Sequence, residues 1–168
     1  MAVETFLNDT IEQRIVPMLR EVGAMFPRAV GRVIPYWTDK TPTPAWMIYP
    51  IPPMRQTYAS RGETAHVHQT YTLGMRLYYA PAEAGYVGVK EEFVGWQLIP
   101  TVLEYFTARR GLCYQAAQTV PAWLEPNQTT ITTASPFGMF PDAASVVGCE
   151  FVLSLTFQRV IQSVHNNP

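Results

Sequence analysis

Charged side chains are scarce in this chain. Only 15% of its 168 residues are charged, against about a quarter in an average soluble domain, whereas 48% are hydrophobic. Twelve Lys and Arg residues nearly balance thirteen Asp and Glu residues, which leaves a formal net charge of -1. A chain with this charge has no bulk attraction for nucleic acid or for an anionic membrane. We therefore expect neither sequence-specific nucleic-acid binding nor a membrane partner.

Cysteines are few, and long apolar runs are missing. The two cysteines, Cys113 and Cys149, are too few for a disulfide framework and are predicted to be buried thiols. No uninterrupted apolar run approaches the roughly 18 residues of a membrane-spanning helix. The first residues are acidic and lack the basic and apolar segments of a secretion signal. We therefore expect synthesis in the cytoplasm without export.

Motifs for catalysis and cofactor binding are absent as well. The sequence has no Gly-x-Ser-x-Gly elbow, no Walker phosphate loop and no dinucleotide-binding glycine pattern. His66 and His68 would share one face of a strand, but a metal site needs further ligands. The third histidine, His165, lies in a polar tail, and Glu63 falls in a predicted turn. We predict no catalytic residue, cofactor or metal, and place both histidines on the polar face of an edge strand.

Prolines, in contrast, are abundant, with 15 in the chain. Many of them fall in a predicted proline-rich connection at about residues 35–65, with short strands expected around residues 30–36 and 45–49. A strand bounded by proline lies at a sheet edge or is very short. The length fits one domain over residues 1–168, with a loose tail at residues 163–168.

Two helices and two long strands can be predicted from the apolar spacing. Apolar residues recur every three or four positions over residues 3–26 and 89–110, which predicts amphipathic helices with kinks at Pro17 and Pro100. Residues 66–79 and 147–158 alternate between apolar and polar, as half-buried strands do. The prediction is an α+β fold with a mainly antiparallel sheet, in which two long strands pack against two amphipathic helices.

The first long strand is too long for the domain. Fourteen residues span about 46 Å, whereas a domain of this length is roughly 40 Å across. The start of the strand and the connection before it should therefore project as an arm. An aromatic ring and arginine side chains are typical interface anchors. The predicted protein-interface residues of this arm are Tyr58, Arg61, Glu63, His66 and His68.

The order of these elements resembles the tail terminator proteins of long-tailed bacteriophages, the lambda-type tail-completion family. The matching stretches are Thr43-Pro-Ala-Trp-Met-Ile-Tyr49, the strand at residues 68–79, the helix around residues 90–110 and the strand at residues 147–157. The resemblance covers most of the chain and concerns its layout, since the family has no catalytic motif to match. The segments before Trp46 and at residues 113–141 are longer than in the family pattern.

The resemblance implies a structural virion protein at the head–tail junction, made in the host cytoplasm. Six copies would form a ring that caps the tail tube, ends its polymerisation and joins the tail to the head connector. The implied partners are the chain itself, the tail tube protein and the connector proteins. Two alternatives stay open. One is another head–tail joining or tail-tube protein, and the other is a small-ligand-binding α+β protein or cofactor-free enzyme built on the many aromatic residues.

Overall fold

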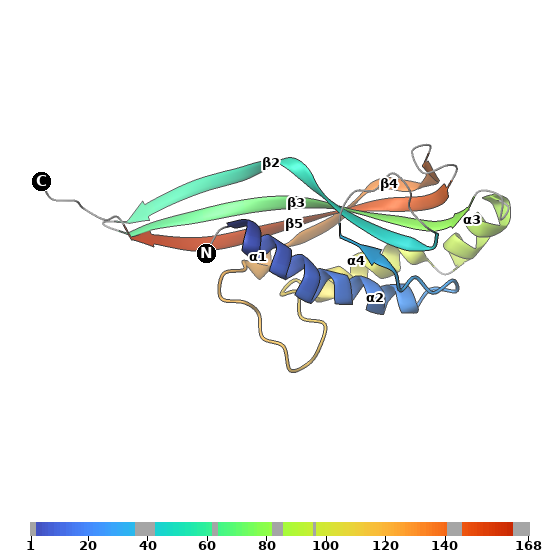
Figure 1. Ribbon diagram of the computed structural model, residues 1–168, viewed down its shortest axis with the longest axis horizontal. Coiled ribbons are helices and arrows are strands. Elements are labelled where there is room, and N and C mark those ends of the chain that lie inside the picture. The colour runs from blue at the N-terminus through green and yellow to red at the C-terminus, as the bar shows by residue number, and fades with distance from the viewer. Residues whose placement is uncertain are drawn as a thin grey trace, which may run out of the picture.

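A computed structural model describes residues 3–35, 43–61, 64–81, 86–95, 97–140 and 146–162. Its centre is a five-stranded sheet in the order β1-β2-β3-β5-β4, with helices packed on one face (Figure 1). Every neighbouring pair of strands is antiparallel except β1 and β2, which are parallel. The predicted α+β fold with a mainly antiparallel sheet is confirmed.

Three strands of the sheet are unusually long. The five strands are β1 Val33–Ile34, β2 Ala45–Arg61, β3 Thr64–Pro81, β4 Thr130–Phe140 and β5 Val146–Gln162. Both alternating segments of the sequence are confirmed as strands, β3 and β5, which pair along their whole length. Leu73 lies opposite Leu153, and Met75 opposite Phe151, so the apolar faces of the two strands coincide.

The short strand predicted around residues 45–49 is confirmed as the start of β2, whereas the proline-rich connection predicted beyond it is wrong for residues 50–61, which continue the strand. The pairing of β2 with β3 is irregular only between Ile51 and Arg55, where two prolines, Pro52 and Pro53, fall. Strand β1 pairs with β2 only up to Met47, so the later prolines meet no described strand on their outer side. Proline, which cannot donate a backbone hydrogen bond, is tolerated at such edges and bulges.

Both predicted helices are interrupted. The first consists of α1 Val3–Thr10, a π-turn Ile11–Ile15 and α2 Val16–Ala24. The wide turn directly precedes Pro17, whose ring would clash with the carbonyl four residues earlier. The second consists of α3 Tyr86–Gly95 and α4 Leu98–Ala108, separated at Gln97, which has a φ of 50°. The kink predicted at Pro100 is therefore misplaced, because Pro100 lies in the first turn of α4, where its missing N–H costs no bond.

The core lies between the helices and one face of the sheet. Trp46 is fully buried there, with ring centroids 6.1 Å from Phe26 and 6.0 Å from Phe151. Gly23 of α2 allows close packing, since a Cβ atom there would lie 2.2 Å from the carbonyl oxygen of Val30. Of the two thiols predicted to be buried, Cys149 is buried and Cys113 is half-exposed. Within the described residues, no helix is long and apolar enough to cross a membrane.

A polar contact joins helices α2 and α4. The hydroxyl of Tyr105 on α4 donates a 2.7 Å hydrogen bond to the carboxylate of Glu21 on α2. The guanidinium of Arg109 lies 4.0 Å from the centre of the Tyr105 ring. Burial, followed by the hydrogen bond to Glu21, raises the pKa of Tyr105 well above its ordinary value. The phenol is therefore held in its protonated form.

Candidate assembly site

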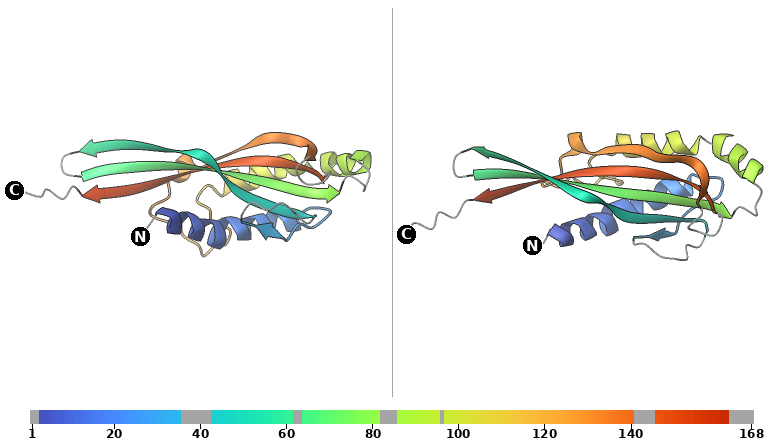
Figure 2. Two further views of the ribbon diagram at one scale, coloured as in Figure 1. Left: turned by 45° about the horizontal axis from the view of Figure 1, so that its top comes forward. Right: turned by 90° about the horizontal axis from the view of Figure 1, so that it is seen from above.

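The helices cover only part of the sheet, and the remainder projects as an arm (Figures 1 and 2). We define the arm as residues 55–61 of β2, residues 64–70 of β3 and residues 156–162 of β5. Their pairing is regular throughout, with β3 in the centre. The arm predicted from strand length is confirmed, but it is a three-stranded sheet rather than a strand with a loop. It forms because β2 and β5 both continue beside β3.

Four of the five predicted interface residues lie in this arm. Tyr58 and Arg61 lie in β2 close to the tip, and their side chains are outside the described part of the structure. Glu63 also lies outside the described residues. His66 and His68 lie on β3 and point to the same face. Their predicted place on an edge strand is wrong, because β2 and β5 flank β3 on both sides and leave the two imidazoles half-buried.

The face of the arm with the histidines carries mainly polar side chains. The hydroxyls of Thr70 and Thr156 lie 3.0 Å apart, directly across β3 and β5. The side-chain nitrogen of Gln158 lies 3.1 Å from Nδ1 of His66. Nδ1 of His68 is buried and has no hydrogen-bond partner among the described residues. The same part of the chain brings no third His, Cys, Asp or Glu side chain to the two histidines.

An aromatic cluster fastens the root of the arm on the side of the helices. The ring of Phe157 contacts Tyr71 edge-on at 5.2 Å and stacks on Trp123 at 4.8 Å. The segment around Trp123 also pairs with β5, since the N–H of Gln158 donates to the carbonyl of Trp123 at 2.7 Å. This segment belongs to the long connection before β4, and no pattern in the sequence predicts its pairing. Past Gln158, no described strand covers the outer side of β5.

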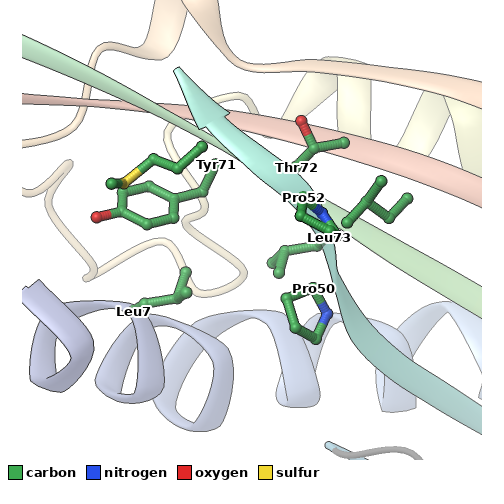
Figure 3. A pocket seen from close by; sticks show the side chains of 8 residues that line it. Leu7, Pro50, Pro52, Tyr71, Thr72 and Leu73 are labelled. Atoms are coloured by element: carbon green, nitrogen blue, oxygen red, sulfur yellow. The ribbon is translucent and has the colours of Figure 1, made fainter. Parts of the chain in front are cut away.

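An apolar cavity of about 500 Å³ lies beside the root of the arm, between α1 and the irregular part of β2 (Figure 3). Leu7 faces it from the helix, and Pro50, Pro52 and Leu73 face it from the strands. The Tyr71 hydroxyl is buried without a hydrogen-bond partner among the described residues, and burial raises its pKa. The cavity can accept an apolar group, and it offers few polar contacts to orient a substrate.

A charged pair occupies the opposite face of the sheet, away from the helices. Arg76 on β3 lies directly opposite Glu150 on β5, with 3.3 Å between guanidinium and carboxylate. Arg76 also lies 5.6 Å from the ring centre of Tyr49. That ring covers Gly74, where a Cβ atom would lie 2.3 Å from Tyr49 Cζ. The two side chains are only 15% and 13% exposed, and burial raises the pKa of Glu150. Their pairing across β3 and β5 could not be predicted from the sequence.

Comparison with known proteins gives this chain no family. No known family model matches the sequence, and no curated protein matches it.

Proposed function

We propose that this chain is a structural virion protein whose copies form a ring of six, a homohexamer, at the end of a bacteriophage tail tube. The ring caps the tube, ends its polymerisation and joins the tail to the head connector. One observation carries the proposal. Three strands of 17, 18 and 17 residues extend beyond the helices as an arm whose two outer edges meet no described strand near its tip.

Such an arm is suited to assembly. A strand edge presents unpaired N–H and C=O groups, to which another chain can add. Two different edges on one subunit allow a head-to-tail contact between neighbouring copies. Repeated contacts of this kind form a ring when the rotations from copy to copy add up to one full turn. The mainly polar face of the arm is compatible with contact to another protein surface. The resemblance of the element order to that of tail terminator proteins supports the position at the tube end.

A second candidate function is favoured by the cavity between α1 and β2. Its volume, about 500 Å³, suits a small apolar ligand, and Tyr71 and Thr72 are its polar lining residues. Native mass spectrometry of the purified protein decides this candidate. A stoichiometric small molecule, lost in a Leu73→Asn variant that still folds, supports a ligand-binding protein. A bare protein mass favours the assembly proposal.

Co-expression with a phage tail-tube protein, if a gene neighbouring that of this chain encodes one, tests the proposed function. Tube protein expressed alone should polymerise into tubes of uncontrolled length. With this chain present, we expect shorter tubes that carry density at one end in electron micrographs. Unchanged tube lengths with bare ends would contradict the proposal. Incorporation along the whole tube would instead identify a tail-tube protein.

A further inference from the structure

The contacts of β5 at the root of the arm show which of its backbone N–H and C=O groups point away from β3. The carbonyl of Thr156 accepts a 2.9 Å hydrogen bond from Glu125, and the N–H of Gln158 donates to Trp123. Both contacts lie on the side away from β3. In an antiparallel strand, outward-facing residues alternate with residues that pair inward. The pairing with β3 is regular here, so the N–H and C=O of Val160 and Gln162 also face outward.

The same alternation fixes the outward groups of β2. The residues of β3 opposite Val160 and Gln162 are His66 and Thr64. Because Val160 and Gln162 direct their backbone groups outward, the N–H and C=O groups of His66 and Thr64 bond to β2 rather than to β5. Their partners on β2 are Ala59 and Arg61. The intervening residues of β2 near the tip, Tyr58 and Ser60, therefore direct their backbone N–H and C=O away from the sheet.

The two edges are at the same height along the arm. Ser60 pairs with Ala65 of β3, which pairs with Ile161 of β5, and Tyr58 is level with Arg159 in the same way. Strands β2 and β5 are both antiparallel to β3, so both run toward the tip (Figure 1). Rotation about an axis parallel to the arm, with no shift along it, therefore brings Ser60 opposite Ile161 of the next copy.

We infer that neighbouring copies join by parallel pairing of residues 58–60 of β2 with residues 160–162 of β5. In a parallel ladder, a residue bonds to the two residues that flank its opposite number. Ser60 opposite Ile161 would thus donate to the carbonyl of Val160 and accept from the N–H of Gln162. These are the groups that face outward. This inference rests on the proposed ring and names the contact that closes it.

Other features of the edges agree with this contact. The prolines and the irregular pairing of β2 end before Arg55, and neither residues 57–61 nor residues 159–162 contain proline. The segment around Trp123 stops covering β5 at Gln158, where the free edge begins. Monomeric proteins block such edges with prolines, bulges or covering segments.

The variants Ser60→Pro and Val160→Pro test the inference, with Ser60→Ala and Val160→Ala as matched controls. Each proline removes one outward N–H and spares the pairing with β3. Light scattering after gel filtration should give the ring mass for the wild type and both controls. Each proline variant alone should give monomers, with circular dichroism confirming that it still folds. A mixture of the two proline variants should give dimers, because each variant retains the edge that the other lacks.

The outcomes separate the possibilities. Rings formed by either proline variant, or a mixture that stays monomeric, overturn the inferred edge contact but leave the ring proposal standing. The inferred contact is also overturned if only one proline variant dissociates. That result indicates that one edge pairs with the same edge of a second subunit around a two-fold axis. A wild type that stays monomeric at every concentration contradicts the proposed ring itself, and the edge contact with it.

Discussion

Leu153→Asp should prevent stable folding of the chain. Leu153 is 1% exposed and lies on β5 between Leu73 of β3 and Ile131 of β4. Truncating a core leucine costs about 2.7–5 kcal/mol. A buried polar group without a partner adds about 1–3 kcal/mol. The combined loss approaches or exceeds the total stability of about 5–15 kcal/mol for a typical domain.

Urea unfolding followed by circular dichroism measures this effect. The matched control is Ser154→Asp, because the next residue on β5 points to the opposite face, beside Arg55 and Thr70 at a polar surface groove. We expect the control to change the free energy of unfolding by less than about 1 kcal/mol. A Leu153→Asp protein with the wild-type unfolding midpoint would refute the assignment of faces along β5.

Three further predictions follow from the described side chains. Above pH 10, the phenol of Tyr105 ionises in the unfolded chain while the raised pKa keeps it protonated in the fold, so stability should fall as pH rises. In Tyr105→Phe, the urea unfolding midpoint should fall less steeply above pH 10 than in the wild type. The same pH profile for both proteins would argue against the effect. A thiol reagent should modify Cys113 but not Cys149 in the native protein, and both in denaturant, because burial raises the pKa of Cys149. Two fast-reacting thiols in the native protein would contradict this. Replacing His66 and His68 together by alanine should leave metal content and fold unchanged, whereas zinc present in the wild type and lost in the variant would revive a metal site.

Strands β3 and β5 could be predicted from the sequence because they separate an apolar face from a polar face over many residues. The apolar face lies under helices, so Leu73 and Leu153 had to alternate with polar neighbours. The projection of the arm followed from strand length alone. These features depend on local pattern and on the size of the domain.

The second half of β2 could not be predicted, because its residues do not alternate between an apolar face and a polar face. Pro50, Pro52 and Pro53 suggest a loop, and only the pairing with β3 shows that they lie on an edge. The contact of Trp123 with β5 is also hidden, since it joins residues far apart in sequence. The two edges of the arm could not be predicted either, because they depend on the register of three strands, which no single segment specifies.

The helix interruptions were predicted in part. Proline signals a missing N–H but does not say how the chain accommodates it. At Pro17 a widened turn precedes the proline and the helix continues. At Pro100 the chain breaks earlier, at Gln97, and restarts so that the proline falls in a first turn. Both solutions satisfy the same local constraint, so packing selects between them.

Electron microscopy of the purified chain tests the central claim most directly. End-on class averages should show closed rings with six-fold symmetry, and side views should show the arms lying together on one side of each ring. Single subunits at all concentrations, two-fold dimers or open filaments would contradict the account.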